Sequence, residues 1–155
     1  LEMLALIHDI GKIAIPKSIL FKPGALEPEE WRIMQKHCEI GYRIAACSPE
    51  LVSLEDAILS HHEHWDGEGY PQGLNEEQIP LISRILSIAD AYDVLTNGRP
   101  YRKPVSSEEA LREIQQCAGT QFDPRLAGIF ISMIEEEQGK QSKECFPLKS
   151  GVIRN

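Results

Sequence analysis

Apolar positions in this chain recur mostly at three- and four-residue intervals, which is the period of an amphipathic helix. The segment 81–97 is the clearest case. Four apolar residues share one of its faces: Ile82, Ile85, Leu86 and Ala89. Helices are expected over the ranges 1–9, 28–47, 49–63, 81–97, 107–118 and 124–137. Since no segment alternates convincingly like a strand, the pattern predicts an all-α fold.

Turn-forming residues and helix caps predict the boundaries between these helices. Prolines and glycines mark loops over 13–27 and 65–80, and Gly11 is expected to stop the first helix. The serines and glutamates of 106–109 resemble a helix cap. The helical period fades from Gly139, so we expect one domain over 1–138 and a tail or linker over 139–155. The apolar opening at Leu1 suggests a piece of a longer protein.

Composition narrows the class of protein. Hydrophobic residues make up 42% and charged residues 26%, an ordinary balance for a globular domain, and the net charge of −8 disfavours a nucleic-acid partner. No run of about 18 apolar residues predicts a membrane span. The 4 cysteines form no CxxC pair, and we interpret them as reduced thiols of a cytoplasmic protein.

Histidines are the most informative residues, because three of the 5 fall within His61-His62-Glu63-His64. Two adjacent, half-buried imidazoles would repel each other if charged and would need partners if neutral. A metal ion satisfies both rings. Imidazoles and carboxylates without thiolates suit iron, manganese, zinc or nickel. His64 is expected at the surface or in a supporting position.

Further polar residues fit a metal centre that acts on phosphate, although each also has a simpler interpretation. His8 and Asp9 diverge by roughly 100° on a helix, so the aspartate can bridge two ions, but the dipeptide alone matches a surface pair. His37 alone would be a hydrogen-bonded core histidine. Asp90 lies in an apolar run, and Asp93 shares its helical face.

Basic residues near these positions can contact phosphate. Lys12 follows the His-Asp pair closely. Arg99, Arg102 and Lys103 follow the helix that carries Asp90, either as a solvated basic turn or as a phosphate clamp suited to the fork of arginine.

The ordered set of these motifs resembles the HD-GYP family, a branch of the HD phosphohydrolase superfamily, over roughly residues 1–138. The matching motifs are His-Asp-Ile-Gly-Lys at 8–12, His37 with Gly41, His61-His62-Glu63, Asp66-Gly67 with Gly69-Tyr70-Pro71, Asp90 to Asp93, Arg99-Pro100-Tyr101-Arg102 and Phe122-Asp123-Pro124.

The resemblance implies an HD-type helical bundle with a buried centre of two or three divalent metal ions, with iron or manganese preferred and zinc or nickel compatible. It implies hydrolysis of cyclic di-GMP in bacterial second-messenger signalling, to the linear dinucleotide and, after a second cut, GMP. By position, the first metal takes His8, Asp9 and Asp90. The second takes His37, His61 and His62, with Asp9 shared. The resemblance implies that Lys12 and Asp93 are catalytic. It also implies that the substrate is bound by Lys12, Tyr70, Arg99 and Arg102.

Some expectations concern what lies outside this chain. The family carries a further histidine, and sometimes a glutamate, on a helix before the His-Asp motif, and no residue here matches them. A sensor or receiver domain is expected upstream. Three other functions stay open: another HD phosphohydrolase acting on a different nucleotide, a di-iron oxygenase, and a non-catalytic signalling module.

Overall fold

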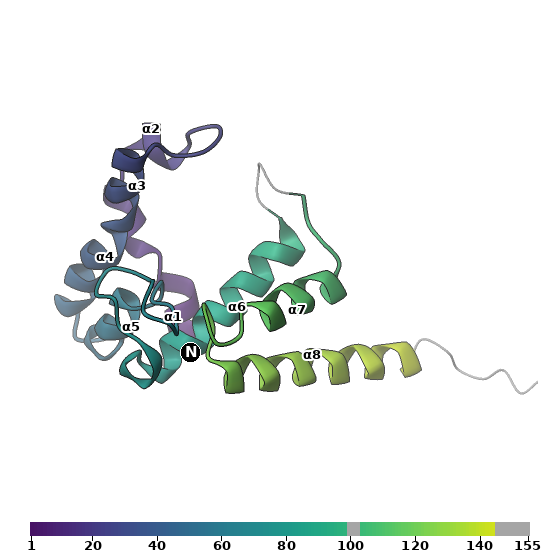
Figure 1. The fold of residues 1–155 in the computed structure, drawn as a ribbon. Helices are drawn as coiled ribbons and strands as arrows, with labels where there is room; N and C mark the ends of the chain where they lie inside the picture. The colour runs from purple at the N-terminus through teal and green to yellow at the C-terminus, as the bar shows by residue number, and fades with distance from the viewer. Residues whose placement is uncertain (99–102, 145–155) are drawn as a thin grey trace, which may run out of the picture.

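The computed structural model describes residues 1–98 and 103–144, and within these ranges the chain is helical without a β-strand (Figure 1). The α-helices are α1 (Glu2–Ile7), α2 (Lys17–Leu20), α3 (Pro28–Gln35), α4 (His37–Ala46), α5 (Glu55–Leu59), α6 (Leu81–Asn97), α7 (Ser107–Gln116) and α8 (Pro124–Glu144). Three 3-10 segments are η1 (Ile10–Ala14), η2 (Val52–Leu54) and η3 (Glu76–Gln78). The all-α prediction is confirmed.

Helix α6 contributes to two hydrophobic clusters. Leu86 packs in the first, which α1, α4 and α5 complete with Leu4, Ala45, Ala57 and Ile58. Ile88 packs in the second, which Ile114 of α7, Phe122 of the following loop and Ala127 of α8 complete. In Figure 1, α6 runs from the N-terminal helices toward the α7–α8 pair. Polar residues of α6 are therefore held by cores on both sides.

Side-chain caps fix the two helices that follow α6. Ser106 and Glu109 form the expected capping box at the start of α7, each side chain bonding the other's backbone N–H. At the start of α8, the carboxylate of Asp123 accepts hydrogen bonds from the backbone N–H groups of Arg125 and Leu126. Its second oxygen accepts a hydrogen bond from Arg84 at 2.8 Å, which ties α8 to α6.

The predicted helices over 28–47 and 49–63 are shorter than expected. The first divides at Lys36, between α3 and α4. The segment η1 packs against this division so closely that a Cβ on Gly11 would lie 1.9 Å from the carbonyl oxygen of His37. The second becomes η2 and α5, and His61 and His62 lie in the turn after α5 rather than on the helix.

Three other expectations are also corrected. Gly11 does not terminate α1, which ends at Ile7; it is buried inside η1 because no larger residue fits against α4. The helix α8 continues to Glu144, past the expected end at 137, so the segment 139–155 predicted to be a tail or linker begins within this helix. Good helix formers such as Gln138 and Lys140 support this extension. The short helix α2 interrupts the expected loop 13–27.

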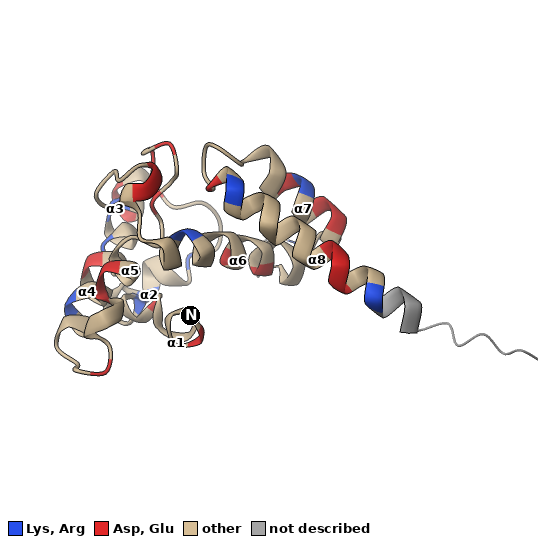
Figure 2. Ribbon diagram, turned by 90° about the horizontal axis from the view of Figure 1, so that it is seen from below, with Lys and Arg blue, Asp and Glu red and all other residues tan. Residues whose placement is uncertain are grey.

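Across the described residues, no helix combines the length and apolar character needed to cross a membrane. Figure 2 shows acidic residues along α7 and α8, consistent with the net charge of −8.

Candidate metal centre

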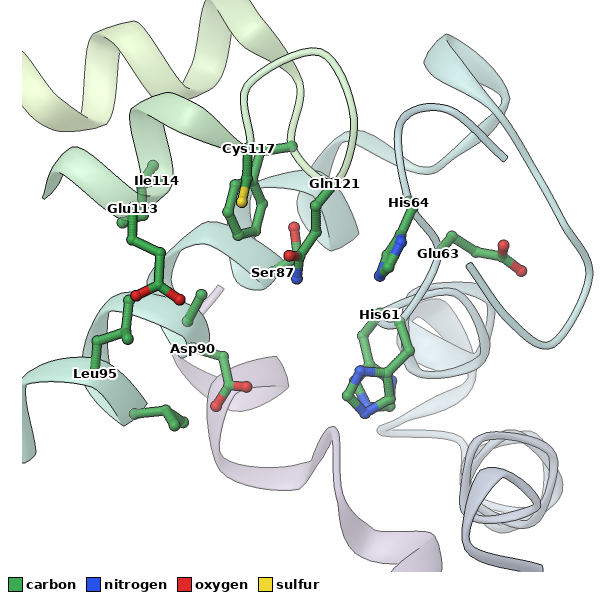
Figure 3. A pocket seen from close by; sticks show the side chains of 14 residues that line it. His61, Glu63, His64, Ser87, Asp90, Leu95, Glu113, Ile114, Cys117 and Gln121 are labelled. Atoms are coloured by element: carbon green, nitrogen blue, oxygen red, sulfur yellow. The ribbon is translucent and has the colours of Figure 1, made fainter. Parts of the chain in front are cut away.

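Four separate parts of the chain bring potential metal ligands together. His8 and Asp9 lie between α1 and η1, and His37 begins α4. His61 and His62 follow α5, and Asp90 projects from α6. Figure 3 shows Asp90 and His61 on opposite sides of the same pocket. The six residues assigned to metals by resemblance are therefore brought close together.

Asp9 lies at the middle of this group. Its Oδ1 atom is 3.4 Å from Nε2 of His37 and 3.8 Å from Nε2 of His61. Its Oδ2 atom is 3.4 Å from Nε2 of His8 and accepts a hydrogen bond from Lys12 at 2.6 Å. Within the described part of the chain, Oδ1 is buried and has no hydrogen-bond partner. A buried oxygen of this kind is costly unless a cation completes its environment, so the position suits a metal ligand.

Three of the histidine rings are oriented by backbone carbonyls one turn earlier. The Nδ1 atoms of His8, His37 and His61 lie 2.9, 2.8 and 2.6 Å from the carbonyl oxygens of residues 5, 34 and 58. A proton on Nδ1 satisfies each carbonyl and leaves the lone pair on Nε2. Carbonyl-bonded rings of this type are usual in metal-binding histidines. The three free Nε2 atoms point toward Asp9.

The ring of His62 is held differently. It stacks on Tyr70 with ring centroids 4.9 Å apart, and its centroid lies 4.1 Å from that of His61. Tyr70 in turn makes an edge contact with Trp31. The aromatic stack therefore links the histidine pair to the loop that follows it.

Ionisation in the metal-free protein favours a ligand set of neutral imidazoles and a carboxylate. Burial lowers the pKa of His37, and lowers the pKa of His62 to about 2 together with the neighbouring histidine rings. Burial alone would raise the pKa of Asp9, but the neighbouring rings of His61 and His8 and the hydrogen bond from Lys12 hold it well below its usual range. The hydrogen bond with Asp9 raises the pKa of His8.

The two aspartates of α6 have different environments. Oδ1 of Asp90 lies 4.0 Å from Nε2 of His8, at the edge of the candidate centre. Asp93 is exposed, and its Oδ1 accepts a hydrogen bond from Asn97 at 2.7 Å. The structure therefore brings Asp90 to the histidines, whereas Asp93 lies one turn further along, on the solvent side.

Cys38 is a candidate ligand that the sequence analysis missed. Its Sγ atom is fully buried and lies 3.5 Å from Nε2 of His37. One potential ligand atom from each of His37, Cys38, His61 and His62 lies within 4.8 Å of the others. Burial raises the pKa of its thiol to about 12 in the metal-free protein. Its position directly after His37 was the feature of the sequence that could have identified it as a candidate ligand.

The buried side chain of Glu63 organises the loop that carries Tyr70. Its two carboxylate oxygens accept hydrogen bonds from the backbone N–H groups of Gln72 at 2.7 Å and Leu74 at 3.1 Å. Gly69 packs against the same segment, where an added Cβ would lie 2.2 Å from the backbone nitrogen of His64. The loop is therefore folded back over the turn that bears the histidines. Sequence analysis gave Glu63 a place in the motif but no role.

A cavity of about 400 Å³ opens beside Asp9 and Lys12. Its walls include the aromatic rings of Phe21, Trp31 and Tyr70. Burial raises the pKa of the Tyr70 hydroxyl, which therefore stays protonated at neutral pH. The walls of this cavity therefore present the ammonium group of Lys12, apolar rings and candidate metal ligands. Arg99 and Arg102, assigned to substrate binding, lie outside the described residues.

A second cavity of about 270 Å³ lies on the other side of the histidines, between α6 and α7 (Figure 3). His61, His64 and Asp90 line it together with Glu113 and Gln121. The candidate metal centre is therefore accessible from two cavities.

Comparison with known proteins supports this description. A family model described as HD domain matches residues 1–126. A cyclic di-GMP phosphodiesterase of Thermotoga maritima is 44% identical over 138 residues, which cover 88% of this chain and 38% of that protein. The cyclic di-GMP phosphodiesterase response regulator RpfG of Xanthomonas campestris is 43% identical over 127 residues, covering 81% of this chain and 34% of that protein.

A solved structure has a similar fold. The crystal structure of a cyclic GMP-AMP specific phosphodiesterase of V. cholerae matches with a TM-score of 0.61 and 25% identity, covering 86% of this chain and 37% of that one. This chain thus spans little more than a third of the length of these relatives.

Proposed function

Because the chain belongs to the HD domain family, we propose that it is the catalytic part of a metal-dependent phosphodiesterase that hydrolyses cyclic di-GMP. The observation that carries the proposal is the convergence of the histidines on the carboxylate of Asp9: the Nε2 atoms of His37 and His61 face its buried Oδ1 atom, and His8 and Lys12 face Oδ2. Relatives named cyclic di-GMP phosphodiesterases support the choice of substrate.

The proposed centre has two groups of ligands that share Asp9. His8, Asp9 and Asp90 form one group, and His37, His61 and His62 form the other. Two or three divalent ions, with iron or manganese preferred and zinc or nickel compatible, suit these nitrogen and oxygen donors. When bound, such ions offset charge on phosphate and activate water at neutral pH.

Lys12 is placed to serve both the centre and a phosphate. Its ammonium group lies 2.6 Å from Oδ2 of Asp9, at the wall of the 400 Å³ cavity. A phosphodiester in that cavity would accept a hydrogen bond from the same group, which offsets negative charge as it develops on the phosphate oxygens. The position of Lys12 also favours phosphate hydrolysis over the di-iron oxygenase alternative, because molecular oxygen carries no negative charge for a lysine to offset.

The aromatic walls of that cavity fit a nucleobase. Trp31 and Phe21 are 47% and 68% exposed, which leaves ring surface free for stacking. Stacking on aromatic side chains contributes about 1–3 kcal/mol per base in single-stranded nucleic acid complexes. We assign one purine of the substrate to this wall. Tyr70, Arg99 and Arg102 retain their proposed contacts with the dinucleotide.

Hydrolysis opens one phosphodiester of the ring and releases a ribose 3′-oxygen, giving the linear dinucleotide; a second cut gives GMP. The test is product chromatography on the protein reconstituted with iron or manganese. Asp9→Asn is expected to lose metal and activity together, whereas Asp56→Asn, an exposed aspartate of α5, is expected to retain both. Full activity in Asp9→Asn would contradict the proposed centre.

The name of the solved relative, specific for cyclic GMP-AMP, supports that dinucleotide as the second candidate substrate. The same centre suits either ring, because both contain the same phosphodiester chemistry. Competition between the two dinucleotides in one assay distinguishes them. Binding without turnover in the metal-loaded protein would favour the non-catalytic module, and turnover of a non-cyclic nucleotide would favour another HD phosphohydrolase.

The relative named as a response regulator supports a receiver domain as the upstream partner. The share of that protein covered here, 34%, leaves room for such a domain. We propose that the complete protein joins this domain to a sensor or receiver domain and acts in the cytoplasm, where a nucleotide messenger is available.

A further inference from the structure

Cys38 lies among the residues proposed to bind metal, although the ligand set expected from the sequence contains no sulfur. It follows His37 in the first turn of α4 and is fully buried. A buried free cysteine often behaves as a small apolar residue. Here, however, its Sγ atom lies 3.5 Å from Nε2 of His37, the nitrogen that is left without a proton by the Nδ1 contact with Met34.

Three distances from Nε2 of His37 match those between ligands of one tetrahedral ion, and Nε2 of His61 lies 3.8 Å from Oδ1 of Asp9. Zinc–nitrogen bonds of about 2.0–2.1 Å place two bound nitrogens about 3.3–3.4 Å apart, and a bound nitrogen and sulfur about 3.5 Å apart. The Nε2 atoms of His37 and His61 are 3.3 Å apart. Nε2 of His37 is 3.4 Å from Oδ1 of Asp9 and 3.5 Å from Sγ of Cys38.

We propose that Cys38 is a thiolate ligand of the metal ion held by His37, His61 and Asp9. The inference rests on the proposed metal centre and adds a donor of a different chemical class to it. The thiol proton is released to solvent when the ion binds, because a coordinating thiol is deprotonated. His62, stacked on Tyr70, is adjacent and can complete a larger coordination shell.

A thiolate changes which ion the centre selects. Together with Asp9, which the two ligand groups share, it gives this ion two anionic ligands. Sulfur favours zinc and other soft or borderline ions over manganese, which prefers oxygen donors. Cys38 therefore biases the centre toward zinc, cobalt or iron, and a chain without this sulfur would accept manganese more readily.

Cobalt(II) spectroscopy of the full chain tests the ligand directly. The cobalt-loaded protein is expected to show a near-ultraviolet thiolate-to-cobalt charge-transfer band. Cys38→Ser is expected to lose the band while elemental analysis still finds cobalt. Matched controls are Cys47→Ser, at an exposed site, and Cys117→Ser, which lines the second cavity; both are expected to keep the band.

Metal competition gives a second readout. Removal of an outer-sphere partner typically weakens metal binding about 10–100-fold. Loss of a direct ligand in Cys38→Ser is therefore expected to weaken zinc binding by about tenfold or more, and manganese binding by much less. An unchanged zinc-to-manganese preference would contradict the proposal.

Zinc X-ray absorption on the unaltered protein answers the question even if Cys38→Ser fails to fold. Sulfur in the zinc shell supports the proposal, and a shell of nitrogen and oxygen alone overturns it. Cobalt bound without the charge-transfer band overturns the role of Cys38 but leaves the metal centre intact. Failure of the unaltered protein to bind any of these ions contradicts the metal centre itself.

Discussion

The carboxylate of Glu63 accepts a hydrogen bond from the backbone N–H of Gln72 at 2.7 Å and so fastens the loop containing Tyr70 to the turn containing His61 and His62. The residue is 3% exposed, and Leu74 donates a second backbone hydrogen bond to it. A buried carboxylate with two such partners fixes the loop relative to the histidines. Residues 62 and 70 owe their stacked arrangement to this contact and to the hydrogen bond from the Tyr70 N–H to the carbonyl of His62.

Glu63→Ala is expected to destabilise the protein and to loosen this loop. Each hydrogen bond to a charged group contributes about 1.5–3 kcal/mol. The free energy of unfolding from denaturant titration should therefore fall by about 3 kcal/mol or more, and ligand binding should weaken. Glu63→Gln keeps one acceptor oxygen, so its free energy of unfolding should lie between those of the unaltered protein and Glu63→Ala. Glu39 is exposed and serves as the control. If Glu63→Ala lowers the free energy of unfolding no more than Glu39→Ala does, the proposed role of Glu63 is contradicted.

Tyr70→Ala and Trp31→Ala are expected to weaken cyclic dinucleotide binding more than metal binding. Both rings line the cavity beside Lys12, outside the proposed ligand set. Loss of a stacking ring should cost about 1–3 kcal/mol, or roughly 5- to 150-fold in Kd. Calorimetry with cyclic di-GMP and elemental analysis would be run on the same samples.

Tyr42→Ala is the matched control for these two variants, because Tyr42 lies on α4 and does not line that cavity. It should leave dinucleotide affinity unchanged. Equal loss of metal and dinucleotide in Tyr70→Ala would show that the ring supports His62 rather than the substrate.

Acid should destabilise the metal-free protein. The pKa of His62 is about 2 in the folded state and near 6.5 in the unfolded chain, so protons bind the unfolded chain preferentially between these values. The lowered pKa of His37 acts in the same direction, and the raised pKa of His8 opposes it. The free energy of unfolding should fall as the pH decreases from about 7 to about 5, by up to about 1.4 kcal/mol per pH unit for one histidine.

Thermal melts of metal-free protein across this pH range measure the effect. His62→Gln removes one group that titrates on unfolding, so its Tm should depend less steeply on pH. A Tm that rises on acidification would mean that the raised pKa of His8 outweighs the lowered pKa values of His37 and His62.

The sequence predicted most reliably what local pattern determines. The strong period of 81–97 gave the bounds of α6, and the Ser106–Glu109 pair gave the start of α7. The prediction of one helix over 28–47 missed the division at Lys36, because no local breaker marks it and the close approach of Gly11 to α4 is a tertiary contact. The end of α8 was missed because its last turns are polar and lack a repeating apolar face.

In the candidate site, too, the motif residues could be predicted from the sequence, whereas contacts between residues distant in the sequence could not. The motif residues His8, Asp9 and His61 were identifiable because their chemical types and order are distinctive. The partners of Glu63 are backbone N–H groups 9 and 11 residues away, which no residue type reveals. The direction in which Cys38 points from α4 likewise depends on packing. The functional roles of these residues stay predictions.

Asp93→Asn tests whether this aspartate orients or deprotonates the nucleophile. Its carboxylate is exposed, accepts a hydrogen bond from Asn97, and lies one turn of α6 beyond Asp90, outside the proposed ligand groups. Asparagine keeps the shape but cannot take the proton, so metals should stay bound while hydrolysis slows about 10²–10⁴-fold. Asp90→Asn is the comparison and should lower metal content as well as rate. If Asp93→Asn hydrolyses cyclic di-GMP at the parental rate with full metal content, Asp93 serves only to bind Asn97, and the base must be sought among residues nearer Asp9.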